Sequence, residues 1–181
     1  VKTRSTILLR SFESGDGPAR VQTTPLLRLT SRTRGEVLRS LPAVELEQSQ
    51  IRDGVPKVGT AIGSEALRTL SMRPTLNGVL PFASTSFASC LADEHDSCVY
   101  IGPVAYNFIN VARRLRAPSG STLPSTQSSF LRCELPTSAD ADGVLALFSS
   151  RIAYWLWNVD GDGFHVSRKF VERISSFWNE L

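Results

Sequence analysis

The sequence predicts an α+β fold in which a small mixed sheet precedes a C-terminal helix–turn–strand–helix unit. Two observations support this prediction. β-branched and aromatic residues, interrupted by Gly-Pro, dominate residues 97–114, and a compact apolar strand follows at residues 130–135. Further along, apolar residues from Val144 to Leu156 recur at helical spacing. With 181 residues and 41% hydrophobic content, the chain can bury one core, or one core and part of another.

A β-hairpin is expected at the start of the chain. Residues 4–12 (RSTILLRSF) form a β-rich apolar run that ends at the turn sequence SGDGP, and residues 19–29 follow as a second strand, with Pro25 at an edge or bulge. A two-stranded hairpin is marginally stable by itself. We therefore expect it to join a larger sheet, and the start at Val1 rather than Met favours a piece of a longer protein.

Two helices are expected next, in a region whose composition differs from its neighbours. Residues 31–42 predict a short helix that ends before Pro42, and a clearer helix begins with Ser64 as N-cap and stops at Pro74. This change of character predicts three parts of the chain, namely residues 1–41, a connecting helical segment at 42–80, and a domain at 81–181.

The last part contains the most regular pattern. Residues 97–114 predict two short strands or one bent strand, and a polar loop at 117–129 leads into the strand at 130–135. One continuous helix is expected from an N-cap at Ser138 or Asp140 to Trp157. The turn NVDGDG then leads to a short FHV strand and to a second helix capped by Ser167.

Several site chemistries find little support in the sequence. An EF-hand is excluded at Asp160 and Asp162, because Phe164 and Val171 occupy positions that require acidic ligands, so DGDG is interpreted as a turn. His165 could act as a general base, but it alternates with apolar residues like a strand residue, and no nucleophile elbow is recognisable. No phosphate loop or Gly-x-Gly-x-x-Gly motif is present. The chain is expected to carry no catalytic residue and no cofactor of its own.

The three cysteines permit a metal site as a minor alternative. Their odd number, with no disulfide-scaffold spacing, fits a reducing compartment and a cytoplasmic protein. Cys90, His95, Cys98 and Cys133 could together hold zinc. The spacing lacks the close ligand pairs of zinc fingers, so no metal is predicted. No apolar run approaches the roughly 20 residues of a membrane span, and no membrane partner is expected.

Basic and aromatic residues of the chain have the chemistry that a nucleic-acid interface requires. Net charge is +3, and no acidic residue occurs between Tyr100 and Cys133. Arginine binds phosphate and reads guanine edges, but genome base composition explains the arginine richness of the whole chain equally well. For the arginines at 113–116, a solvated turn is the more ordinary interpretation. Trp155 falls on the helical apolar stripe, so Tyr154 and Trp157 are the better candidates for base stacking, against the commoner role of aromatics in packing. The candidate DNA-binding residues are Arg113, Arg114, Arg116, Arg132, Arg168 and Lys169.

The ordered segments SSFLRCEL and DADGVLALFSSRIAYWLWNVDGDGFHVSRKFVERI resemble a known arrangement. They are similar to the C-terminal part of adenine-N6 DNA methyltransferases whose catalytic domain is fused to a target-recognition domain, as in single-chain restriction-modification enzymes. The resemblance covers about fifty residues and includes a strand, a helix of the type LLALLNSxLxxxW, a glycine turn, a short strand and a further helix. Phe148 and Ser149 depart from it, because the family tends to show Leu-Asn there.

This resemblance implies a DNA target-recognition fragment that binds duplex DNA. Residues 1–41 would be the trailing strands of the methyltransferase domain, and the S-adenosylmethionine site and Asn-Pro-Pro-Tyr motif of the parent protein would lie upstream, in a partner domain of the same chain. The recognition domain would hold the duplex while the catalytic domain receives an extruded adenine. Two alternatives remain at this stage: a protein-interaction or structural module that docks through the C-terminal aromatic helix, and a small hydrolase that uses His165 with a carboxylate and a nucleophile.

Overall fold

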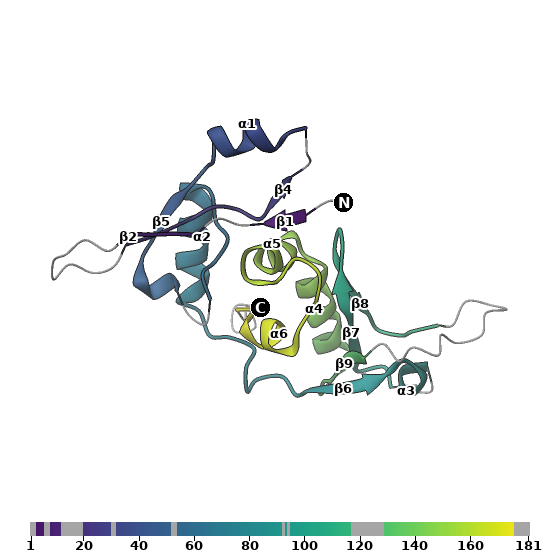
Figure 1. The fold of residues 1–181 in the computed structure, drawn as a ribbon. Helices are drawn as coiled ribbons and strands as arrows, with labels where there is room; N and C mark the ends of the chain where they lie inside the picture. The colour runs from purple at the N-terminus through teal and green to yellow at the C-terminus, as the bar shows by residue number, and fades with distance from the viewer. Residues whose placement is uncertain are drawn as a thin grey trace. The chain divides into compact units, whose positions relative to one another are not determined.

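The computed structural model describes residues 3–5, 8–11, 20–29, 32–51, 54–91, 93, 95–116 and 129–175 (Figure 1). The chain is α+β and divides into two compact units. The N-terminal unit comprises Val1–Pro74 with Asn158–Asp160, and the C-terminal unit comprises Thr75–Trp157 with Gly161–Leu181. The three-part division expected from the sequence stays a prediction.

In the N-terminal unit the expected hairpin is present, but each of its arms is divided into two strands. β1 (Thr3–Ser5) pairs antiparallel with β4 (Leu27–Leu29), and β2 (Leu8–Ser11) pairs antiparallel with β3 (Arg20–Thr23). β5 (Val44–Leu46) adds to the outer side of β3. The third strand therefore comes from the segment expected to be helical. The predicted SGDGP turn lies outside the described residues.

Helices complete the N-terminal unit. They are α1 (Arg34–Arg39), a 3₁₀ turn η1 (Gln48–Gln50) and α2 (Ala61–Ser71). The N-cap of α2 is Thr60, whose hydroxyl accepts a hydrogen bond from the backbone N–H of Gly63 at 3.0 Å. The expected N-cap, Ser64, instead lies inside the helix, where its carbonyl and hydroxyl accept from the Gln50 side chain at 2.8 and 3.0 Å. The prediction of Ser64 as the cap was wrong by one helical turn.

A four-stranded antiparallel sheet forms the centre of the C-terminal unit. Its strands are β6 (Phe82–Ser86), β7 (Cys98–Ala105), β8 (Ile109–Ala112) and β9 (Ser129–Glu134), in the order β6-β9-β7-β8. Every described strand pair is antiparallel, whereas a mixed sheet was expected; the two halves of residues 97–114 form a hairpin, which needs no long crossover. Most of the predicted polar loop at 117–129 lies outside the described residues.

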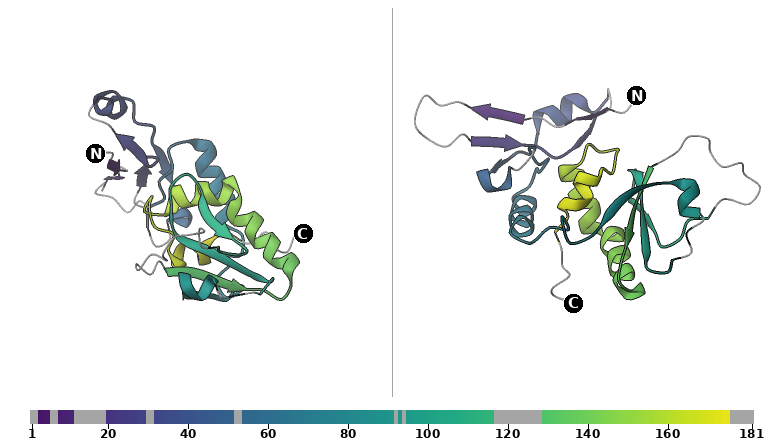
Figure 2. Two further views of the ribbon diagram at one scale, coloured as in Figure 1. Left: turned by 90° about the vertical axis from the view of Figure 1, so that its right-hand side faces the viewer. Right: turned by 90° about the horizontal axis from the view of Figure 1, so that it is seen from below.

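The two faces of this sheet have different surroundings. Phe82, Cys133 and Val99 are opposite one another on paired strands and so share a face. The helix α4 (Ser138–Ser149) packs against this face (Figure 2). The ring of Phe148 on α4 meets that of Phe82 edge-on at 6.3 Å. Tyr100 lies on the opposite face with the buried cysteines Cys90 and Cys98; the short helix α3 (Phe87–Leu91) supplies Cys90.

The helix expected from residue 138 to Trp157 is divided at Ser150. Thr137 caps α4 through a reciprocal pair of hydrogen bonds with Asp140, which explains why the expected caps, Ser138 and Asp140, lie inside the helix. Ser150 is extended, and its hydroxyl accepts from the N–H of Ala153 at 3.1 Å to start α5 (Arg151–Asp160). The prediction of one continuous helix was wrong.

The segment after α5 follows the expected order. Gly163 adopts a φ of 81°, which favours glycine, in the DGDG turn. His165 then forms an antiparallel bridge with Val104. The hydroxyl of Ser167 accepts from the N–H of Phe170 at 3.1 Å and begins α6 (Arg168–Arg173), as predicted. Among the described residues, no helix combines the length and apolar character that crossing a bilayer requires.

Candidate nucleic-acid interface

The closed end of the β7–β8 hairpin exposes two aromatic side chains. Tyr106 and Phe108 are 56% and 63% exposed, and the side chain of Asn107 between them is also exposed. The Tyr154 hydroxyl donates to the Tyr106 carbonyl at 2.8 Å, and the Asn110 amide donates to the Val104 carbonyl at 2.9 Å. The hairpin end is therefore fixed from both sides.

Phe164 and His165 support this hairpin end from the turn after α5. The N–H of Ala105 donates to the carbonyl of Phe164 at 3.0 Å. The ring of Phe164 meets Tyr106 edge-on at 5.5 Å and His165 at 4.8 Å. We refer to Tyr106, Phe108, Phe164 and His165 as the aromatic hairpin end. Sequence analysis did not predict its exposure, although an apolar Phe108 at a turn position, where polar residues are usual, is a detectable sign.

Asp162 fixes the orientation of His165. Its Oδ1 accepts hydrogen bonds from the N–H groups of Phe164 and His165 at 2.7 and 2.6 Å, and its Oδ2 lies 2.6 Å from Nδ1 of the imidazole. Burial acts to raise the pKa of Asp162, but these hydrogen bonds outweigh it and lower the pKa below its usual value. Asp162 therefore supplies the carboxylate that the hydrolase alternative requires beside His165. In the described part of the chain, however, no Ser or Cys side chain bonds to the His165 ring, so the geometry provides no nucleophile.

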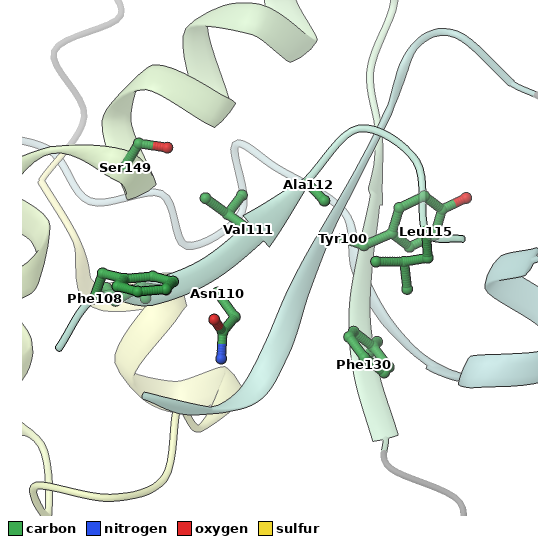
Figure 3. Close-up of a pocket in the computed structure, with 9 residues that line it drawn as sticks. Tyr100, Phe108, Asn110, Val111, Ala112, Leu115, Phe130 and Ser149 are labelled. Carbon is green, nitrogen blue, oxygen red and sulfur yellow. The ribbon is translucent and has the colours of Figure 1, made fainter. Parts of the chain in front are cut away.

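A hollow with a volume of about 530 Å³ lies along β8 (Figure 3). Aromatic and aliphatic side chains form most of its lining, and it is open to solvent. It is lined by Tyr100, Phe108, Ile109, Asn110, Val111, Ala112, Leu115, Phe130 and Ser149. Phe108 therefore belongs both to the hairpin end and to this hollow.

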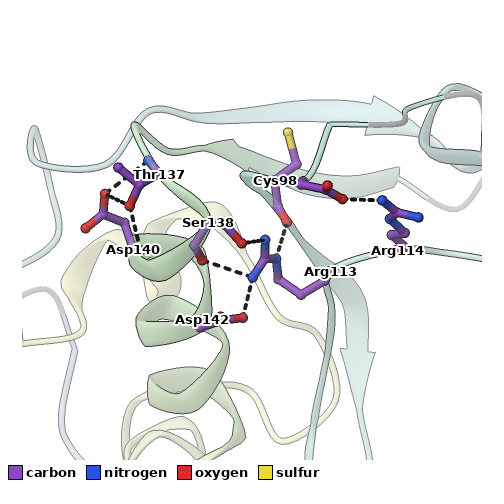
Figure 4. A network of polar contacts seen from close by, with 8 residues as sticks. Cys98, Arg113, Arg114, Thr137, Ser138, Asp140 and Asp142 are labelled. Carbon is purple, nitrogen blue, oxygen red and sulfur yellow. Dashed lines mark hydrogen bonds and ion pairs between the residues drawn. The ribbon is translucent and has the colours of Figure 1, made fainter.

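Arg113 connects the end of β8 to the beginning of α4 (Figure 4). Its guanidinium donates to the carbonyl of Cys98 at 3.2 Å and to the carbonyl and hydroxyl of Ser138 at 3.1 and 3.0 Å, and it forms an ion pair with Asp142. Its side chain is only 20% exposed. All these contacts are internal, so Arg113 has a structural role in this conformation.

Three other candidate arginines also form ion pairs. Arg114 pairs with Asp96, and Arg168 pairs with Glu172 at 2.6 Å. Arg132 binds Asp93 at 2.7 Å and Glu134 at 2.9 Å. These carboxylates reduce the net positive charge that the arginines present to a ligand.

The two remaining candidate cations, Arg116 and Lys169, are exposed. Within the described ranges, Arg116 forms no hydrogen bond or ion pair, and it directly follows the open end of the β7–β8 hairpin. The structure thus places Arg113, Arg114 and Arg116 together at that end, and Arg168 and Lys169 elsewhere in the unit, on α6.

The two candidate stacking residues differ in accessibility. Trp157 is fully buried at 0% exposure, and its indole N–H donates to the carbonyl of His165 at 2.9 Å. Tyr154 stacks on it at 5.6 Å. Trp157 has no face open to a base, and Tyr154 is occupied with Trp157 and Tyr106. The expected placement of Trp155 inside and Trp157 outside is reversed, since Trp155 is only partly buried.

The cysteines are buried thiols. Burial raises the pKa of all three, that of Cys133 to about 11, so they are protonated at neutral pH. His95 is exposed. Within the described ranges, no group of three or more His, Cys, Asp or Glu side chains is arranged to hold a metal ion. Comparison with known proteins yields no match to a family model, a curated protein or a solved structure.

Proposed function

We propose that this chain is a DNA target-recognition fragment that binds duplex DNA. The observation that carries the proposal is the β7–β8 hairpin, which contains no acidic residue, exposes Tyr106, Asn107 and Phe108 at its closed end, and continues into exposed Arg114 and Arg116 at its open end. A two-stranded ribbon fits the major groove of DNA, where amide and aromatic side chains contact base edges and arginines contact phosphates.

The difference in charge between the two units suggests that one provides attraction to phosphates and the other provides contacts with bases. Residues 1–74 contain 12 Lys and Arg against 7 Asp and Glu, whereas residues 75–181 contain 8 against 10. Attraction to phosphates is largely independent of sequence and depends on net positive charge. We therefore assign most of the attraction to the N-terminal residues and assign contact with bases to the hairpin.

The wider setting follows from the resemblance in the sequence. The proposed parent is an adenine-N6 DNA methyltransferase or restriction-modification enzyme of the cytoplasm, whose upstream domain binds S-adenosylmethionine and the extruded adenine. The alternative of a module that docks through its aromatic helix is less well supported, because Trp157 is buried and Tyr154 packs on it.

Salt-dependent binding tests the proposal. The chain should bind a fluorescently labelled duplex of mixed sequence, and log Kd should rise linearly with log salt concentration because bound phosphates release counterions. Replacement of Arg116 by Ala should weaken binding to all duplexes alike and reduce the salt slope by about 1. Ile62→Ala is the control, since it shortens an exposed side chain on α2 without changing the charge of the chain. Folded protein that fails to bind at low salt, or binds independently of salt, would contradict the proposal.

A further inference from the structure

The exposed ring of Phe108 is not required by the packing of the hairpin. The side chain is 63% exposed at the closed end of β7–β8, in a position where a polar turn residue would leave the strand register unchanged. Removal of such an apolar side chain from water is accompanied by a favourable change in free energy. Much of this free energy is therefore available to a ligand that covers the ring.

The chain on either side of Phe108 is held in place before any ligand binds. Tyr106 is held by the hydroxyl of Tyr154 and by the edge of Phe164, and Asn110 closes the hairpin on the other side of Phe108 through the carbonyl of Val104. A side chain on a rigid support loses little conformational entropy on binding. The hairpin end is therefore suited to insertion between groups that must be pushed apart.

The composition and dimensions of the hairpin suit nucleobases as the occupant. Neither β7 nor β8 contains a charged residue of either sign, so the hairpin itself does not repel a polyanion. Arg114 is six residues beyond Phe108, which at about 3.3 Å per residue corresponds to at most roughly 20 Å. The hairpin can therefore place Phe108 at a base step while the exposed Arg114 and Arg116 beyond its open end reach phosphates up to about six base pairs away, since a helical turn of about 10 base pairs spans about 34 Å.

We propose that Phe108 is a wedge that inserts between neighbouring bases of the bound duplex and unstacks one base step, on a hairpin end that the contact of Tyr106 with Phe164 helps to hold in place. This inference rests on the proposed binding of duplex DNA. Apolar side chains inserted in this way separate a base step and deform the helix. Stacking of an aromatic ring on a base contributes about 1–3 kcal/mol, which corresponds to a factor of about 5 to 150 in Kd.

Unwinding of plasmid DNA tests the wedge without knowledge of a target sequence. Relaxed closed-circular plasmid is incubated with the protein and a type I topoisomerase, the protein is removed, and the topoisomers are resolved on a gel. Wild-type protein should leave a changed linking number, because the topoisomerase compensates for the unwound base steps. Phe108→Ala should weaken binding about 5- to 150-fold and should leave the linking number unchanged even at equal occupancy. Phe108→Trp should retain the effect.

Controls separate the wedge from the proposed function. Val79→Ala removes an exposed apolar side chain elsewhere in the same unit and should behave like wild type. Wild-type protein that binds duplex without a change in linking number, or Phe108→Ala protein that still unwinds DNA, overturns the wedge and leaves duplex binding intact. Self-association that depends on Phe108, without unwinding, also overturns it in favour of a protein contact. Failure of wild-type protein to bind any duplex overturns both proposals.

Discussion

The carboxylate of Asp93 lies 2.7 Å from Nε of Arg132, which follows 39 residues later in the chain, and it also accepts a hydrogen bond from the hydroxyl of Tyr100. The Asp93 side chain is only 11% exposed. Tyr100 and Arg132 are direct neighbours on the paired strands β7 and β9. One carboxylate therefore connects the segment after α3 to two strands of the sheet.

Removal of this carboxylate should destabilise the C-terminal unit. Asp93→Ala leaves the Tyr100 hydroxyl without its acceptor and Arg132 with only Glu134, and loss of a partner for buried polar groups costs about 1–3 kcal/mol. Urea unfolding curves of the wild-type and Asp93→Ala proteins measure this loss of stability. Asp96→Ala is the control, because the exposed pair of Asp96 with Arg114 should contribute less than about 1 kcal/mol. Equal losses in the two variants would argue against a special role for Asp93.

Stability should also depend on pH through Asp93. Burial acts to raise its pKa, but the hydrogen bonds from Tyr100, Arg132 and the backbone N–H of His95 outweigh this and hold the pKa well below its usual value of 3.8. A depressed pKa in the folded state stabilises the protein fully above the unfolded-state pKa, and this stabilisation is lost as pH falls through the folded-state value.

The measurement is a series of urea unfolding curves between pH 6 and pH 2. The free energy of unfolding of the wild-type protein should fall as pH drops below about 4. In Asp93→Asn this fall should be shallower, because the titrating group is gone. Asp162, whose pKa is also lowered, should contribute part of the decrease in unfolding free energy at low pH in both proteins. Parallel curves for the two proteins would show that Asp93 does not titrate as inferred.

The ion pairs show why sequence analysis could predict the elements but not the site. Strand periodicity revealed β7, β8 and β9, because alternation and glycine turns are local properties. The partners of Arg113, Arg114 and Arg132 are 29, 18 and 39 residues away, so their pairing depends on tertiary structure. Exposure of the aromatic hairpin end likewise depends on where β7 turns, which composition alone does not determine.

The reversal of Trp155 and Trp157 has a single local origin. Helical spacing counted from Val144 assumes a continuous helix, and it places Trp155 on the buried stripe. The extended backbone of Ser150 restarts the helix and resets its phase, which turns Trp157 into the core. Sequence periodicity gives the correct face only as long as the helix is unbroken.

Trp157 should accordingly be the more important tryptophan for stability. Trp157→Ala removes a fully buried ring and leaves the carbonyl of His165 without the indole donor, which should cost about 3–5 kcal/mol. Trp155→Ala, at a partly buried position, should cost clearly less. Thermal unfolding followed by circular dichroism compares the two variants. A larger loss in Trp155→Ala would contradict the structural placement.

Gly161 at the end of α5 should tolerate no side chain, and the reason is close approach rather than backbone dihedral angle. Its φ is −77°, which any residue adopts, but a Cβ there would lie 2.5 Å from the carbonyl oxygen of Trp157. The same position lies 3.0 Å from Cδ1 of the buried indole, so neither atom can move freely. Gly161→Ala should therefore destabilise the protein by about 1–3 kcal/mol.

Gly35→Ala is a matched control, because it should not lower the stability of the protein as Gly161→Ala does. It lies inside α1, and a Cβ there would meet no atom within 4 Å. Because glycine costs up to about 1 kcal/mol relative to alanine inside a helix, Gly35→Ala should leave stability unchanged or increase it. Urea unfolding gives the free energy of unfolding of both variants for comparison with wild type. If Gly161→Ala were as stable as Gly35→Ala, the close contact between Gly161 and Trp157 would not exist in solution.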